Sequence, residues 1–214
     1  MGFLTAEDER ATDSRPSSLD ITTRKEFQFS KSGLSGIQIS SKAYGKDQPS
    51  HFYIETSVYL PSSKKDIIIH AGKDAKGKVL GDVDLKNFSG HYTIELGDPK
   101  SDRDEVILEE LDRVKGWSSK HEFSFTFGQR ERQTFVWRHR GQVLSENRED
   151  LELVIEDPER EEEDEVFAQY ERNGGEHGWK SKGHLLLKQG GGEQWELMVI
   201  LTVMALIVSK NREQ

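Results

Sequence analysis

Residues 197–208 read Leu-Met-Val-Ile-Leu-Thr-Val-Met-Ala-Leu-Ile-Val, an apolar run in a chain whose mean hydropathy is −0.76 and of which 32% is charged. A helix that spans a bilayer needs about 20 apolar residues, because it covers about 30 Å of hydrocarbon at about 1.5 Å per residue. This run has roughly half that length, which is more typical of a buried helix in a soluble domain. A helix that is apolar on every side must be surrounded by protein. We therefore expect the preceding residues to enclose it, and we expect no transmembrane span.

The residues before this run have the pattern of an all-β protein. From Lys25 onward, short apolar segments recur between clusters of Gly, Pro, Asp, Asn and Lys, as in strands joined by turns. We predict about twelve strands, at residues 26–29, 36–40, 52–60, 66–71, 78–85, 91–96, 105–111, 122–127, 133–138, 150–155, 166–170 and 183–187.

Two aromatic strands joined by a short polar connection form the clearest pair. Phe123, Phe125 and Phe127 alternate with polar residues, and side chains along a strand alternate between its two faces. Phe135 and Trp137 alternate in the same way on the second strand. The sequence therefore predicts a β-hairpin whose inner face is aromatic.

The number of strands and the apolar run together predict the fold. Many antiparallel strands must protect their edges, and closure into a barrel removes every edge. A barrel of about twelve strands has a wide lumen, which one apolar helix would fill. We predict a closed antiparallel barrel around a central hydrophobic C-terminal helix, comprising residues 25–214. Residues 1–24 are polar and lack sustained periodicity, so we expect a disordered tail.

Several short motifs also suggest a family. They are Phe123-x-Phe125, Phe135-Val136-Trp137-Arg138, Val166-Phe167-Ala168-x-Tyr170 and the segment from Trp195 to Val208. With them the chain resembles the tubby C-terminal-like superfamily, which includes tubby-like proteins, LURP-one-related proteins and phospholipid scramblases. Among its members, uncharacterised fungal proteins with this domain are the most similar. The resemblance covers about residues 25–212 and implies a twelve-stranded barrel around a C-terminal helix, with binding of phosphoinositide or another anionic lipid headgroup. No residue matches a specific headgroup motif, so no site is carried over from the family.

The charge is distributed unevenly along the chain. Residues 150–165 hold ten acidic residues and one arginine, which accounts for the whole net charge of −9. Residues 113–148 hold eight basic and three acidic residues. A local basic face is therefore compatible with the overall acidity, and charge blocks of this kind bear on partners rather than on fold.

Four arginines in the basic region are the candidate ligand-binding residues, namely Arg130, Arg132, Arg138 and Arg140. Arg138 and Arg140 alternate with Phe135 and Trp137, so we expect them on the outer face of the barrel. The planar guanidinium group of arginine can bind two phosphate oxygens at once. The alternative is that these arginines only form a solubilising outer face.

The sequence offers little for catalysis or for metal binding. Cysteine is absent, which excludes disulfides, thiol catalysis, Cys-ligated zinc and palmitoylation. The seven histidines show no close ligand spacing, and no Gly-x-Ser-x-Gly motif is present. Residues 72–78 have the spacing of a phosphate-binding loop, but Val79 stands where that loop needs Ser or Thr. We expect no enzymatic activity, no catalytic residue, no metal and no cofactor.

These observations lead to a functional hypothesis with two alternatives. The leading hypothesis is a binding protein of tubby-like type that contacts phosphoinositide or another anionic membrane lipid. One alternative is a protein-interaction module with no lipid role, and the other is a membrane protein anchored by its C-terminal apolar segment. We expect a monomer in the cytoplasm or peripherally at a membrane, with no nucleic-acid partner.

Overall fold

The computed structural model describes residues 24–33, 36–41, 51–57, 65–86, 90–98, 106–115, 119–126, 131–140, 150–156, 164–172 and 183–213. The predicted N-terminal tail lies outside these residues, except for Arg24, which begins the first strand.

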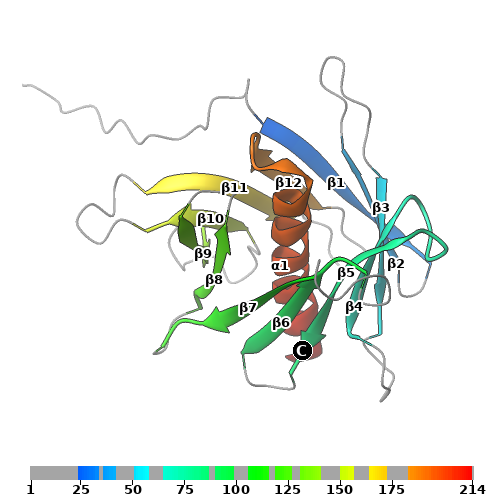
Figure 1. Cartoon of the computed structure of the whole chain (residues 1–214), viewed down its shortest axis with the longest axis horizontal. Coiled ribbons are helices and arrows are strands. Elements are labelled where there is room, and N and C mark those ends of the chain that lie inside the picture. Colours follow the sequence, from blue (N-terminus) through cyan, green and yellow to red (C-terminus); the bar gives the residue numbers. More distant parts are fainter. Residues whose placement is uncertain are drawn as a thin grey trace, which may run out of the picture.

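The described residues form a closed barrel of twelve antiparallel strands with one helix inside it, as predicted (Figure 1). Each strand pairs with its neighbours in sequence, and the first pairs with the twelfth to close the barrel. The elements are β1 (Arg24–Ser32), β2 (Gly36–Ser41), β3 (His51–Thr56), β4 (Ile67–Ala71), β5 (Val79–Leu85), β6 (His91–Leu96), β7 (Ile107–Arg113), β8 (His121–Thr126), β9 (Arg132–His139), β10 (Leu151–Ile155), β11 (Glu165–Arg172), β12 (Gly183–Lys188) and α1 (Gly192–Glu213).

The strands form because apolar residues occupy alternate positions along them. In β3, for example, Phe52, Ile54 and Thr56 are buried, whereas the residues between them are partly exposed. Since side chains of a strand alternate between its faces, one face of each strand supplies the wall of the lumen and the other meets solvent.

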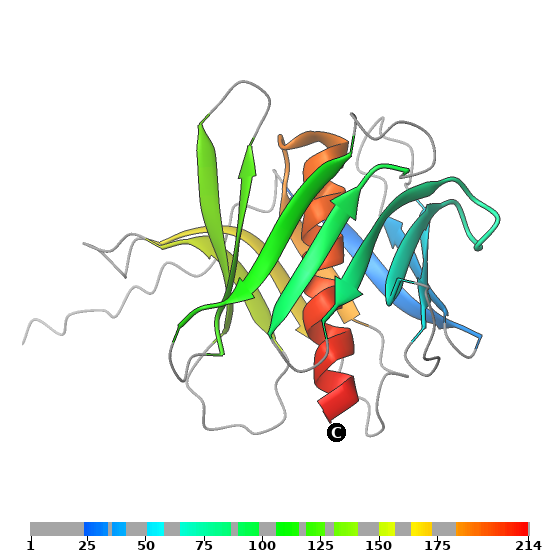
Figure 2. The same cartoon turned by 60° about the horizontal axis from the view of Figure 1, so that its bottom comes forward.

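Helix α1 runs through the lumen (Figures 1 and 2). Met198, Val199, Ile200, Leu201 and Val203 are all 0% exposed, although they point in different directions around the helix. The helix has 22 residues, more than the apolar run that predicted it. Of the helices and strands described, α1 is the one helix long and apolar enough to cross a membrane, and 61% of the window meeting that criterion is buried in the barrel.

A run of glycines turns the chain from β12 back into the lumen. Gly190 and Gly192 have φ angles of +108° and +78°, which L-residues with a side chain rarely adopt. A Cβ atom on Gly191 would lie 2.2 Å from Cδ1 of Trp195. The turn therefore requires glycine both for its backbone conformation and for the close packing of Trp195.

Trp195 anchors the first turns of α1 in an aromatic cluster. Its ring centroid lies 4.7 Å from that of Phe135, 5.4 Å from that of Phe125 and 6.2 Å from that of Phe123. The predicted aromatic hairpin is thus confirmed as β8 and β9, although Phe127 lies outside the described residues.

One buried polar contact sits in the middle of this apolar core. The indole Nε1–H of Trp137 donates a hydrogen bond of 3.0 Å to Oγ1 of Thr202, and the Thr202 hydroxyl donates to the carbonyl oxygen of Val199. Both polar side chains are therefore satisfied, which explains how a threonine is accommodated in the apolar run at 0% exposure.

The buried helix makes a first testable prediction. Leu201→Asp would place a carboxylate without a partner in the lumen, at a cost of several kcal/mol in a domain whose total stability is about 5–15 kcal/mol. We expect the variant to lose its cooperative unfolding transition in urea, followed by circular dichroism. Leu201→Met keeps the volume and should cost less than about 1.5 kcal/mol. A Leu201→Asp protein with a wild-type transition would contradict the role of α1 as the core.

Candidate functional site

The arginines predicted as an anion site lie in and just after β9. Arg138 is next to Trp137, whose ring is in the lumen, and so falls on the outer face; Arg140 follows the end of the strand, and Arg132 at its start reaches the buried Glu109. Arg130 lies outside the described residues.

Arg138 is held by acidic side chains on β10, just after β10 and just before β11. Its Nε donates to Oε1 of Glu152 at 2.8 Å and its Nη1 donates to Oδ2 of Asp164, whose side chain is 3% exposed. Nη1 also lies 3.9 Å from Oε1 of Glu156. Burial lowers the pKa of the Arg138 guanidinium, but the hydrogen bonds to Glu152 and Asp164 outweigh it and raise that pKa above its ordinary value. Arg138 therefore neutralises buried carboxylates of its own chain.

Arg132 has a different structural role. β7 and β8 pair through only two residue pairs, where every other neighbouring pair of strands has at least four, and they diverge away from that contact (Figure 2). Arg132 donates to both carboxylate oxygens of Glu109 on β7, with a distance of 2.7 Å from Nη1 to Oε1. This hydrogen bond raises the pKa of Arg132. The arginine thus links β9 to β7 where β7 and β8 are no longer paired.

Arg140 forms an exposed ion pair with Glu171 on β11, at 2.8 Å. Arg132 and Arg138 are six residues apart along β9, which corresponds to about 20 Å. Each described arginine of the predicted site is therefore bound to carboxylates of this chain, and the structure does not bring the three together around one ligand.

These pairings predict a contrast in stability between two arginines. Arg138→Ala leaves Asp164 and Glu152 without their arginine in a largely buried place, so we expect a loss of roughly 3 kcal/mol in the free energy of unfolding. Arg140→Ala breaks an exposed pair and should cost less than about 1 kcal/mol. Urea denaturation of the two variants measures both values, and equal losses would contradict the contrast.

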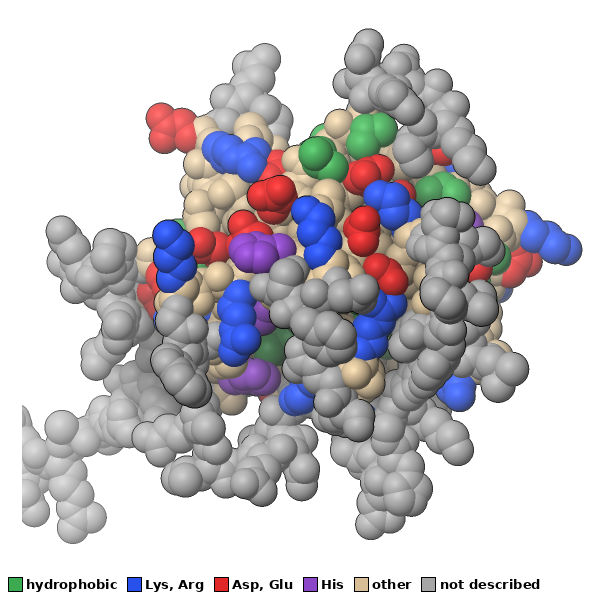
Figure 3. Space-filling model, turned by 90° about the horizontal axis from the view of Figure 1, so that it is seen from below, with side chains coloured by type: hydrophobic (Ala, Val, Ile, Leu, Met, Phe, Trp, Pro, Cys, Tyr) green, Lys and Arg blue, Asp and Glu red, His purple; other side chains and the backbone are tan. Residues whose placement is uncertain are grey.

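A larger candidate site lies at the end of the barrel where α1 ends. A cavity of about 240 Å³ lies there between the last turns of α1 and one end of β6 to β10. The residues that line it are Gly90, Tyr92, Arg113, Ser119, His121, His139, Leu151, Leu206, Ile207, Ser209 and Lys210. None of these described lining residues is acidic. Figure 3 views the molecule from this end, where histidine and basic side chains lie beside one another.

The alternation of the strands places the polar groups in this cavity. Arg113, His121 and His139 are each the inward position that follows the last buried apolar residue of their strand. Arg113 and His121 are direct partners in the ladder between β7 and β8. The inner face therefore changes from apolar to basic within one step along three consecutive strands.

His121 is the most strongly perturbed group of the cavity. Burial lowers its pKa to about 4, with a further contribution from the charge of Arg113 and a smaller one from His139. A hydrogen bond with the backbone of Ser119 and the carboxylate of Asp112 oppose this shift. The imidazole is therefore neutral at neutral pH in a site that already holds cations.

The deeper part of the cavity is apolar. Tyr92, Leu151, Leu206 and Ile207 form it, and the Tyr92 ring stacks on His121 with a centroid distance of 5.8 Å and an interplanar angle of 24°. Since a cavity of about 150 Å³ can hold benzene, this cavity has room for a small ligand with both an anionic and an apolar part.

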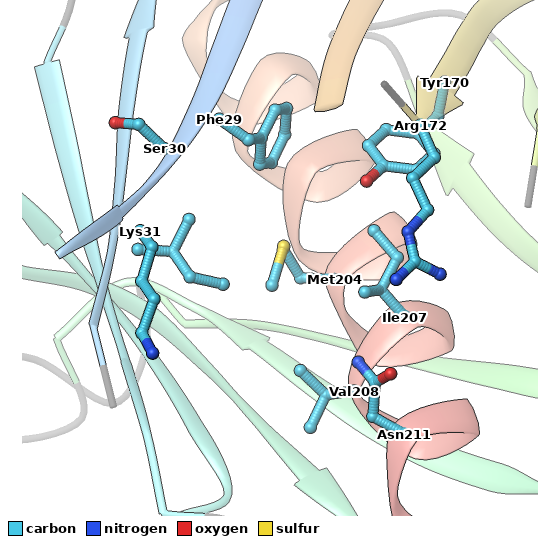
Figure 4. Close-up of a pocket in the computed structure, with 10 residues that line it drawn as sticks. Phe29, Ser30, Lys31, Tyr170, Arg172, Met204, Ile207, Val208 and Asn211 are labelled. Atoms are coloured by element: carbon cyan, nitrogen blue, oxygen red, sulfur yellow. The ribbon is translucent and has the colours of Figure 1, made fainter. Parts of the chain in front are cut away.

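A second, smaller cavity of about 40 Å³ lies on another side of the same helix end (Figure 4). Lys31 of β1 and Arg172 of β11 lie on opposite sides of it, with Met204, Ile207 and Val208 between them. Its volume suits about one water molecule rather than a ligand. Lys31 and Arg172 nevertheless add basic groups to this end of the barrel.

The end of a helix accounts for only some of these basic groups. The last carbonyl groups of α1 carry a partial negative charge, which Lys210 and Arg212 in the final turn complement. Arg212 is also bound to Asp66. Arg113, His121 and His139 come from strands, so the helix end does not explain why they gather there.

Sequence reasoning missed this cavity because it searched for clusters of charge along the chain. The alternation of side chains along the strands nevertheless indicated two of its residues. The next position on the same face of the strand is His121 from Phe123 and His139 from Trp137. The position of Lys210 beside them could not be predicted without the depth of α1 in the lumen.

Comparisons with protein-family models, curated proteins and solved structures found no match to this chain.

The lowered pKa of His121 makes a prediction about stability and pH. Because the unfolded chain, with a pKa of 6.5, binds a proton that the folded state excludes until about pH 4, stability falls as the pH falls through this interval. We expect His121 to contribute a loss of about 2 kcal/mol between pH 7 and pH 5. His121→Gln should reduce the difference between unfolding free energies at these two pH values by that amount. Equal pH dependence in both proteins would show that His121 is not buried as described.

Proposed function

We propose that the protein binds the anionic headgroup of a membrane lipid in the cavity lined by Arg113, His121, His139 and Lys210. The observation that carries the proposal is the combination of a basic mouth with an apolar interior in one cavity of about 240 Å³. A phosphate group would meet the basic side chains, and the adjoining apolar part of the lipid would meet Leu206 and Ile207. The activity is binding, of the tubby-like type that the motifs suggest.

The proposed site differs from the outer face of β9 expected from the sequence. Arg138 is surrounded by three carboxylates, so a phosphate would have to displace them and approach their negative charge. The described lining of the cavity has no acidic residue. An anion in the cavity would not have to displace the carboxylates that hold Arg138, which supports the end of the barrel over the outer face.

Sedimentation with vesicles tests this proposal. Vesicles of phosphatidylcholine with a phosphatidylinositol phosphate are compared with pure phosphatidylcholine, at low and at physiological salt. Each basic residue near an anionic membrane contributes about 1 kcal/mol, so Arg113→Gln with Lys210→Gln should weaken binding about thirtyfold. Physiological salt should weaken wild-type binding, because charges are screened over about 8 Å.

Two matched controls locate the site. Lys73→Gln with Lys76→Gln removes the same charge from the exposed turn between β4 and β5, at the opposite end of the barrel, and should bind as the wild type does. Arg140→Gln tests the outer face. An equal loss in the Lys73 and Lys76 variant would indicate unspecific attraction. No preference for anionic vesicles even at low salt would refute the lipid function and favour the alternative of a protein-interaction module.

A further inference from the structure

The geometry of the cavity points to a coupling between ligand and proton: we infer that His121 takes up a proton when a phosphate-type anion binds. This inference rests on the proposed function, because it requires an anion in the same cavity. It adds a regulation, namely that the protein captures its ligand more tightly as the pH falls. The ligand class is a phosphodiester or phosphomonoester, whose oxygens point in several directions.

The position of His121 carries the inference. The imidazole lies on the inner face of β8 with Arg113 directly opposite on β7, and both line the same cavity. Tyr92 of β6 stacks on one face of the ring. The ring is therefore fixed beside the space that the anion would occupy, and its protonation state responds to any charge placed there.

The charges that face His121 come from several elements. Arg113 of β7 and His139 of β9 disfavour its protonation, and Asp112 of β7 favours it. Lys210 of α1 lines the same cavity and adds a further positive charge. Burial and the positive groups together keep the imidazole neutral.

A bound anion reverses this balance. A phosphate group places one or two negative charges beside the ring, and these offset the field of Arg113 and Lys210. One of its oxygens can also accept a hydrogen bond from the protonated imidazole. Protonation and anion binding then favour each other, and by linkage the affinity must rise as the pH falls. If binding restores the ordinary pKa of the ring, from about 4 to 6.5, the affinity at pH 5 exceeds that at pH 8 by about thirtyfold.

The test uses vesicles of phosphatidylcholine with phosphatidylglycerol, whose phosphodiester keeps one negative charge at both pH 5 and pH 8. The dissociation constant of the wild type should fall at least tenfold from pH 8 to pH 5. His121→Gln should flatten this dependence, whatever its affinity at pH 8. His91→Gln is the matched control, since His91 is an exposed histidine at the same end that pairs with Asp112 and does not line the cavity. It should keep the wild-type pH dependence.

A second measurement does not depend on the His121 variant. Isothermal titration of the wild type at pH 6 with soluble glycerophosphoglycerol, in two buffers of different ionisation enthalpy, measures the protons taken up on binding. We expect uptake of a substantial fraction of one proton, and none in His121→Gln if that variant folds. Binding without proton uptake, or with the same pH dependence in His121→Gln and wild type, would overturn the coupling and leave the proposed function standing. Absence of binding at both pH values would overturn the coupling for this ligand, and the proposed function itself is refuted if vesicles with a phosphatidylinositol phosphate also fail to bind.

Discussion

Packing of α1 against the inner faces of twelve strands is the interaction on which the rest of this structure depends. A twelve-stranded barrel has a lumen too wide for its own side chains to fill. The helix supplies the missing volume, and the strands supply the apolar surface that a helix apolar on every side requires. Each part covers apolar surface of the other that would otherwise contact water. This mutual burial explains why the longest apolar run of such a highly charged chain forms a single helix.

The same arrangement creates the candidate site. The helix is apolar as far as Val208, and the inner faces of β7, β8 and β9 place the apolar Leu111, Phe123 and Trp137 next to Arg113, His121 and His139. Both change to polar residues at the same depth, because both reach water there. The cavity forms at this boundary, so that its apolar interior is the end of the core and its basic mouth is the end of the barrel.

The architecture could be predicted because local patterns of apolar residues in the sequence indicate each strand and the helix. Alternation identified the twelve strands, and the uniform apolar run identified the central helix, although its full length of 22 residues exceeded that run. The site could not be predicted in the same way. Whether Arg138 is available depends on Glu152 and Asp164, which are close to it only after β9, β10 and the start of β11 are assembled. Charge counted along the chain therefore pointed to arginines whose partners in space are carboxylates.

The position of α1 also bears on the alternative in which the C-terminal segment anchors the protein in a membrane. Full burial of one large apolar side chain contributes about 1.5–3 kcal/mol, and α1 buries more than ten residues in the lumen. A bilayer would bury the residues of α1 again, but withdrawal of the helix would expose the apolar inner faces of the strands to water, at a cost above the roughly 5–15 kcal/mol by which a domain of this kind is stable. It would also expose the aromatic cluster that Trp195 fills. The helix can thus be buried in the barrel or inserted in a bilayer, but not both at once. Under the proposed function, the folded barrel would contact a membrane at the end that holds the cavity, where Leu206 and Ile207 belong both to the core and to the wall of the cavity.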